Sequence, residues 1–576
     1  MEHLLIPLGV IIAMCFKFIP KVYFLIMKLF QFMKRFLLLT LFFQFHFCVN
    51  PELNNPCDPR STAYRNTILT KILIADNTSF CGLRFTSGSS AQWTQEAYIK
   101  APNSETNDWF GESVSISGDT IVVGAIFEDS NQTTISNGGT ASNDNSASNS
   151  GAAYVYVRSG TNWSQQAYLK TPNAEDGDQF GRVSISADTI VVGANGEDSN
   201  QTTITNGSTA SLDNSVSFSG AVYVFVRSGT NWSQQAYIKA PNPGGNDQFG
   251  RVVSIDGDTI VVGSFFEDSN QTTITNGNTA SLDNSATDTG AVYVFVRSGT
   301  NWSQQAYLKA PNANDFDIFG QSVSISGDTI VVGAYFEDSN QTTITNGNTA
   351  STDNSATNAG ASYVFVRSGT NWSLQAYLKA PNIEAGDRFG ENVSISGETI
   401  VIGANGEDSN QTTITNGITA SADNSATDSG AAYVFVRSGT NWLLQSYLKA
   451  PNTGSGDQFG RVSISGNTIV VGAIFEDSNQ TTITNGDTAS NDNSAIESGA
   501  AYVYVRSGTN WSQQAYLKAP NGEVGDQFGR VSISGDTVVI GANLEDSNQT
   551  GITNGTSASG NNLAVDSGAA YVFVRK

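Results

Sequence analysis

The chain has 576 residues and a formal net charge of −23. Nucleic acid and anionic lipid surfaces are therefore excluded as main partners, because both are bound by basic patches. The only histidines are His3 and His46. The rest of the chain accordingly has no Ser–His–Asp triad, no Cys–His pair and no His-ligated zinc or iron.

Residues 1–47 have the pattern of a signal peptide. Lys34 and Arg35 form a positively charged start, and the apolar stretch 36–47 follows. This order is typical of a secretory signal. Methionines also occur at Met27 and Met33, so translation starting at either of them is an alternative.

Residues 48–87 form a linker with three cysteines. Cys48 ends the apolar stretch, as the lipidated cysteine of a bacterial lipoprotein does, and we expect export to a bacterial outer membrane, the cell surface or the medium. Simple secretion and an uncleaved anchor are the alternatives, because the residues before Cys48 fit neither cleavage pattern. Cys57 and Cys81 are expected to form a disulfide in an oxidising compartment, or else to stay as two free thiols.

Residues 88–576 contain seven copies of one unit of about 70 residues. A tryptophan marks each copy, and successive markers are 69 or 70 residues apart. The markers are Trp93, Trp163, Trp232, Trp302, Trp372, Trp442 and Trp511. A fixed period of this size indicates supersecondary units that bury their apolar faces against their neighbours. One circular domain, expected to be a monomer, is the natural interpretation.

Each unit contains four segments with β-strand character. In the copy that begins at Trp302 these are 302–309, 322–326, 329–334 and 361–367, which alternate in polarity or are rich in β-branched and aromatic residues. The Gly327-Asp328 turn makes a hairpin of the second and third segments. Seven units of four antiparallel strands predict an all-β, seven-bladed β-propeller.

The units resemble the FG-GAP repeat of integrin α-chain propellers, most closely its bacterial members. The resemblance rests on Phe319-Gly320 followed by Gly333-Ala334, and the Phe-Gly pair recurs in all seven units. Calcium-binding integrin blades have an Asp-x-Asp-x-Asp-Gly loop before the GAP strand. Here that place holds a two-residue turn such as Gly118-Asp119, so the calcium site of the family is not transferred.

The strand order of the family also predicts how the ring closes. Its blades begin at the Phe-Gly strand and end at the tryptophan strand, yet this chain stops at residues 571–576, one strand short. A tryptophan strand, 92–100, precedes the first Phe-Gly pair. We expect it to pair with 571–575 and to remove the free edge. Three units lack one residue after Phe180, Phe459 and Phe528, and we expect the loss to be absorbed at the Gly-Arg that follows.

Long loops follow the second and fourth strands of each blade and should emerge on one face. The first set contains Glu-Asp-Ser-Asn, and the second contains an aspartate just before Phe-Gly. The candidate metal or ligand residues are Glu128, Asp129, Asn131, Asp198, Asp268, Asp338, Asp408, Asp477, Asp546, Asp108, Asp178, Asp247, Asp317, Asp387, Asp457 and Asp526. Their oxygens suit Ca²⁺; the alternative is that they cap turns through local hydrogen bonds.

Three functions are compatible with this pattern. By the integrin resemblance, the protein is a non-enzymatic exported propeller that binds a protein or glycan ligand through its long-loop face. A purely structural surface protein is the second interpretation, since the loops are nearly identical between units. The third is a carboxylate-based glycoside hydrolase, which seven equivalent copies disfavour because catalysis needs one asymmetric set of groups.

Overall fold

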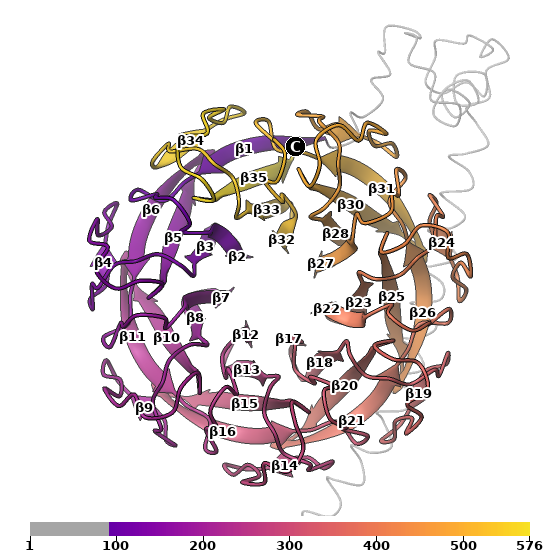
Figure 1. Cartoon of the computed structure of the whole chain (residues 1–576), viewed down its shortest axis with the longest axis horizontal. Coiled ribbons are helices and arrows are strands. Elements are labelled where there is room, and N and C mark those ends of the chain that lie inside the picture. Colours follow the sequence, from indigo (N-terminus) through magenta and orange to yellow (C-terminus); the bar gives the residue numbers. More distant parts are fainter. Residues whose placement is uncertain (1–91) are drawn as a thin grey trace, which may run out of the picture. The chain divides into compact units, whose positions relative to one another are not determined.

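The computed structural model describes residues 92–576, which form one compact unit of β-strands. The predicted signal, Cys48, Cys57 and Cys81 lie outside the described residues. Seven sheets surround a central axis, one for each sequence unit (Figure 1). The prediction of a seven-bladed propeller is therefore confirmed. Within residues 92–576 no helix occurs that could span a membrane.

Within a blade, strands follow one another from the axis outwards (Figure 1). The innermost are β2 (Phe110–Ser117), β7 (Phe180–Ser186), β12 (Val252–Asp256), β17 (Ser322–Ser326), β22 (Phe389–Ser396), β27 (Phe459–Ser465) and β32 (Arg530–Ser534). The second strands are β3 (Thr120–Ala125), β8 (Thr189–Ala194), β13 (Thr259–Ser264), β18 (Thr329–Ala334), β23 (Thr399–Ala404), β28 (Thr468–Ala473) and β33 (Thr537–Ala542).

The third strands are β5 (Ala152–Ser159), β10 (Ala221–Ser228), β15 (Ala291–Ser298), β20 (Ala361–Ser368), β25 (Ala431–Ser438), β30 (Ala500–Ser507) and β35 (Ala569–Arg575). The fourth, tryptophan strands are β6 (Asn162–Leu169), β11 (Asn231–Ile238), β16 (Asn301–Leu308), β21 (Asn371–Leu378), β26 (Asn441–Leu448), β31 (Asn510–Leu517) and β1 (Trp93–Ile99).

Each blade also has a short fifth strand, which the sequence interpretation missed. These strands are β4 (Ser136–Asn137), β9 (Thr205–Asn206), β14 (Thr275–Asn276), β19 (Thr345–Asn346), β24 (Thr415–Asn416), β29 (Thr484–Asn485) and β34 (Ile552–Asn554). The asparagine of each strand has a second role. The Asn137 side chain accepts a 2.7 Å hydrogen bond from the Trp232 amide and donates a 3.1 Å bond to the Trp232 carbonyl, so it joins two blades.

The ring closes as predicted. Strand β1 pairs antiparallel with β35, from Trp93 opposite Arg575 to Ile99 opposite Ala570, and on its other side with β34. The last blade therefore consists of both ends of the repeat region. Strand β1 covers the outer edge of β35, which therefore offers no free ladder to another chain.

The core lies between successive blades. Val292 and Val294 of one blade pack with Phe319, Ile330 and Phe365 of the next, and all five are fully buried. The glycine of the Gly-Ala segment in one blade meets the glycine of the Phe-Gly pair in the next blade. A Cβ on Gly193 would lie 1.7 Å from the Gly250 carbonyl oxygen. No larger residue fits there without moving the backbone.

The three shortened units absorb their missing residue where predicted. In a full-length blade Phe110 pairs with Ala125 and Ser113 with Gly124, which leaves two residues in the bulge. In a short blade Phe180 pairs with Ala194 and Arg182 with Gly193, which leaves one. Beyond the bulge the ladder register is the same, so no strand face is inverted.

Candidate functional site

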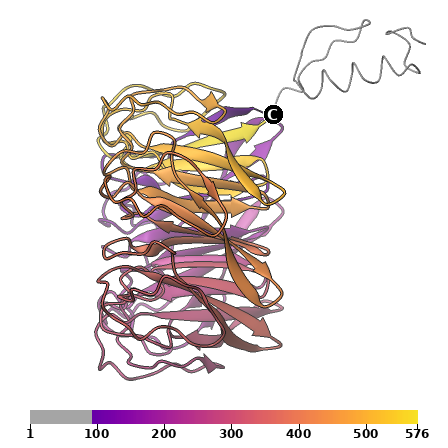
Figure 2. The same ribbon diagram turned by 90° about the vertical axis from the view of Figure 1, so that its right-hand side faces the viewer.

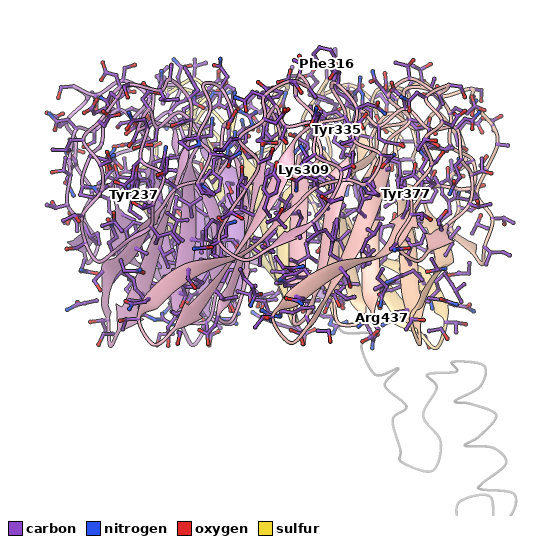
Figure 3. The ribbon with its side chains drawn as sticks, turned by 90° about the horizontal axis from the view of Figure 1, so that it is seen from below. Tyr237, Lys309, Phe316, Tyr335, Tyr377 and Arg437 are labelled. Atoms are coloured by element: carbon purple, nitrogen blue, oxygen red, sulfur yellow. The ribbon has the colours of Figure 1, made fainter. Side chains whose placement is uncertain are left out.

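All long loops emerge on one face, which we call the long-loop face. The opposite face consists of the two-residue turns (Figure 2). Phe316 and Tyr335 lie at the long-loop end and Arg437 lies at the opposite end (Figure 3). This arrangement follows from the antiparallel strand order, because the connections after the second and fourth strands leave at the same edge.

The glutamate of each Glu-Asp-Ser-Asn loop is buried beneath this face. Glu267 is 1% exposed, and its Oε2 lies 3.0 Å from the Lys309 ammonium. Tyr307 Oη donates a 2.8 Å hydrogen bond to Glu267 Oε1, and Asn242 Nδ2 donates one of 3.0 Å. Lys309 and the homologous tyrosines Tyr237 and Tyr377 lie inside the body, below the loops (Figure 3).

The same buried ion pair recurs in every blade. The pairs are Lys100–Glu545, Lys170–Glu128, Lys239–Glu197, Lys309–Glu267, Lys379–Glu337, Lys449–Glu407 and Lys518–Glu476, at 2.8 to 3.2 Å. Burial lowers the pKa of Lys309, and the Glu267 charge opposes that shift. The cation that neutralises each of these glutamates is thus an ammonium group of the chain itself. The sequence contains a signal for this lysine, because a Tyr-x-Lys triplet occurs at the end of every tryptophan strand.

The aspartate of each Glu-Asp-Ser-Asn loop is half-buried and caps a strained turn. Asp129 Oδ1 accepts a 2.7 Å hydrogen bond from the amide of Asn149, whose φ is 55°. The equivalent aspartates, Asp198, Asp268, Asp338, Asp408, Asp477 and Asp546, make the same bond at 2.7 to 2.9 Å. A residue with positive φ is costly unless its surroundings hold it, so this bond has a structural role.

The aspartates before Phe-Gly are buried as well. Asp178 is 5% exposed, and its Oδ2 accepts a 3.0 Å hydrogen bond from the Glu175 amide. Burial raises the pKa of Asp178 to about 8 against the lowering effect of that amide, and the Glu197 charge adds to the rise. Asp108, Asp317, Asp387 and Asp526 have pKa values of about 8, and Asp247 and Asp457 of about 7, with burial as the main cause.

Of the sixteen candidate residues, all within the described part of the chain, Asn131 alone is exposed, and its Nδ2 donates a 2.6 Å hydrogen bond to Ser146 Oγ. Among residues 92–576 no group of three or more His, Cys, Asp or Glu side chains is placed to hold a metal ion. The bond from the Glu175 amide to Asp178 spans three residues and is of the local, turn-capping kind, whereas the bond from the Asn149 amide to Asp129 spans 20 residues. Calcium binding stays a prediction that a melting experiment can decide.

Two features of the described residues were not found from the sequence. A groove of about 300 Å³ lies on the long-loop face between the second and third blades and is lined by Asn200, Thr202, Pro241, Asn242, Pro243, Leu282 and Asn284. A cavity of about 370 Å³ lies on the ring axis among the innermost strands. Both the groove and the cavity could have been found from the few positions at which the seven units differ in sequence.

This architecture defines a closed seven-bladed propeller whose blades are joined through paired Phe-Gly and Gly-Ala segments. The family model described as "FG-GAP repeat" matches residues 93–156, 163–225, 232–295, 302–365, 372–435, 442–504 and 511–573. The chain therefore belongs to the FG-GAP repeat family, and the resemblance of its units to the FG-GAP repeat is confirmed.

No curated protein matches the sequence. Among solved structures, the chain is similar to the one titled "Crystal structure of the Saccharomyces cerevisiae Sqt1". The match has 8% identity and a TM-score of 0.37, and it covers 84% of this chain and 100% of that one.

Proposed function

We propose that this protein is a non-enzymatic, exported or cell-surface propeller that binds a protein or glycan ligand through its long-loop face. Membership of the FG-GAP family is consistent with ligand binding by a surface protein. Export is inferred from the signal-like residues 1–47. The carboxylates that a hydrolase would need in contact with substrate, Glu128 and its six counterparts, are at most 2% exposed.

The observation that supports recognition is the position of the exposed apolar side chains. Nine large apolar residues of the described chain are at least 50% exposed, and eight of them lie in the long loops. These eight are Leu212, Leu282, Phe316, Ile418, Ile496, Val524, Leu563 and Val565. All eight belong to the long loops and none to the two-residue turns, so apolar contacts with a ligand are expected at the long loops.

These residues also differ from blade to blade. Leu282 is 83% exposed at a position where the following blade has Thr352, and Phe316 is 57% exposed where the neighbouring blades have Asn246 and Gly386. The buried framework is repeated almost without change. Variation at these exposed tips gives each sector of the face its own surface, as recognition of an asymmetric ligand requires.

The groove beside Leu282 is a recess of about 300 Å³ on this face. Pro241, Pro243 and Leu282 give it apolar walls, and the amides of Asn200 and Asn284 provide polar groups. Apolar walls with a few placed hydrogen-bonding groups suit a short peptide segment or a sugar ring. The groove is therefore the part of the face at which we expect the closest contact.

A binding screen against extracellular matrix proteins and glycans tests this proposal. Leu282→Ser should weaken binding to a hit at least tenfold. Leu443→Ser is the matched control, because Leu443 is 50% exposed but lies on strand β26, outside the loops. Equal binding by both variants would contradict a ligand site at the groove, and the absence of any hit would support the purely structural role instead.

A further inference from the structure

The cavity on the ring axis differs chemically from the rest of the molecule. It is lined by residues of six of the innermost strands, among them Glu112, Arg182, Arg251, Glu391 and Arg461, and has a volume of about 370 Å³. These strands surround the axis (Figure 1). The cavity is separate from the groove beside Leu282, with which it shares no lining residue.

The basic character of the cavity comes from a single position in each unit. The residue directly after Phe-Gly is acidic, basic or neutral in different units, although the sequence around it repeats. In chain order it is Glu112, Arg182, Arg251, Gln321, Glu391, Arg461 and Arg530. Four arginines and two glutamates leave a surplus of two positive charges, in a chain whose net charge is −23.

One glutamate neutralises two of these arginines. Glu112 Oε1 lies 2.9 Å from Arg182 Nη1, and Glu112 Oε2 lies 2.7 Å from Arg530 Nε. Burial alone would raise the pKa of Glu112, but Arg530 and Arg182 outweigh it and hold the pKa at about 2. This carboxylate is therefore charged at neutral pH, and each of its oxygens is already paired with an arginine.

Arg251 and Arg461 lack such a partner. Among residues 92–576, no carboxylate oxygen lies within 4.0 Å of either guanidinium. Arg251 makes a long 3.4 Å hydrogen bond to Gln248 Oε1 and lies over the Phe265 ring at 5.6 Å. Burial, with the Arg182 charge, lowers the pKa of Arg251 to about 10.

Several polar atoms that line the cavity are buried and have no hydrogen-bond partner in the described chain. They are Arg182 Nε, Gln321 Oε1, Glu391 Oε2 and Arg461 Nε. A buried polar atom without a partner costs about 1–3 kcal/mol, and such atoms are rare in folded proteins. Arg182 Nε and Arg461 Nε are donors whose missing partners the oxygens of an anion can supply, whereas Gln321 Oε1 and Glu391 Oε2 are acceptors, which need a hydroxyl group or a water molecule.

We propose that the axial cavity binds a small anion with at least two anionic oxygens, such as phosphate or a dicarboxylate, between Arg251 and Arg461. These arginines belong to the third and sixth blades, so they approach the axis from well-separated directions. The planar guanidinium fork matches paired anionic oxygens, and the volume lies within the range of small-molecule sites. A bound anion would offset the surplus positive charge.

The experiment is titration calorimetry of the full-length protein with inorganic phosphate, succinate and NaCl at matched ionic strength. We expect saturable binding of phosphate, succinate or both, with a raised melting temperature, and none with NaCl. Phosphate alone would identify a phosphoryl ligand, succinate alone a carboxylate ligand, and both the shared chemistry. Equal effects of all three salts would overturn the proposal.

Variants locate the site. Arg251→Gln and Arg461→Gln should each weaken binding at least tenfold, whereas Arg437→Gln should not. Arg437 is the control because it pairs with Glu398 and stacks on Trp442 at the opposite face. If a glutamine variant does not fold, Arg461→Lys replaces it, because lysine keeps the charge but has no planar fork and should lower the affinity. Unchanged affinity in the axial variants, or an equal loss in Arg437→Gln, would contradict the assignment.

Discussion

The buried lysine–glutamate pair predicts that a single substitution, Lys309→Met, greatly lowers the free energy of unfolding. Lys309 is 1% exposed, and its ammonium donates to Glu267 Oε2 at 3.0 Å, Thr289 Oγ1 at 2.7 Å and the Gly290 carbonyl at 2.7 Å. Methionine has a similar length but no charge. Glu267 would then be a buried anion without a cation.

The magnitude follows from what remains around Glu267. Tyr307, Asn242 and the Ser269 amide still donate hydrogen bonds of 2.8 to 3.2 Å to the carboxylate. Removing one partner of a buried ion pair costs about 3–5 kcal/mol of unfolding free energy. The three remaining donors favour the lower part of that range, and we expect a loss of about 3 kcal/mol.

Guanidinium chloride unfolding, followed by tryptophan fluorescence, measures this loss. Adding Glu267→Gln to Lys309→Met removes the orphaned charge and should recover at least about 1 kcal/mol, so the two changes are not additive. Lys576→Met is the control, because Lys576 is 56% exposed and lies 3.6 Å from Glu96. It should change stability by less than about 1 kcal/mol. A loss below about 1 kcal/mol for Lys309→Met, together with additivity in the double variant, would refute this reasoning.

Four further predictions follow. Deleting residues 88–101 removes β1 and exposes the β35 edge, so size-exclusion chromatography should show aggregates; a monomeric product that unfolds cooperatively would contradict ring closure. The pKa of Asp178 is raised from 3.8 to about 8, so the folded state keeps its proton longer than the unfolded state and stability falls as pH rises from about 4 to about 8. Asp178→Asn should reduce that slope by up to about 1.4 kcal/mol per pH unit in denaturant titrations at pH 5–8, and an unchanged slope would contradict the buried-proton assignment. If the loops bind Ca²⁺, the melting temperature should be higher in millimolar Ca²⁺ than in chelator or in Na⁺ of equal ionic strength, and Asp129→Asn with its six counterparts should abolish the difference; equal effects of Ca²⁺ and Na⁺ would leave only the turn-capping role. Cys48→Ser should release a lipidated protein from the membrane fraction, and unaltered partition would argue against lipidation.

The fold was largely predictable because each strand is repeated seven times with the same alternation and the same turns. The Gly327-Asp328 turn and the tryptophan strand before the first Phe-Gly pair were enough to predict blade hairpins and ring closure. The fifth strand was missed because two-residue strands such as Thr205–Asn206 have no periodicity of their own. They form because the asparagine side chain bonds to a tryptophan backbone in the next blade.

The candidate site was predictable in its general location but not in its chemistry. The sequence indicates which loops share a face, yet it does not show that Glu267 points inward to Lys309, 42 residues away in the chain. A sequence pattern does not distinguish an exposed carboxylate from a buried one that already has a cation. The axial cavity was missed for a different reason, since Arg182, Arg251 and Arg461 lie on three different repeats and come to line one cavity only when the ring closes.

The central claim is that the long-loop face recognises a ligand. Hydrogen–deuterium exchange, with and without a ligand from the binding screen, tests it most directly because it reports on both faces at once. We predict protection of the long loops near the groove, residues 200–202, 241–247 and 282–284, and none in the opposite turns at 326–329 and 397–399. Protection confined to those turns, or no difference on the long-loop face, would contradict the claim.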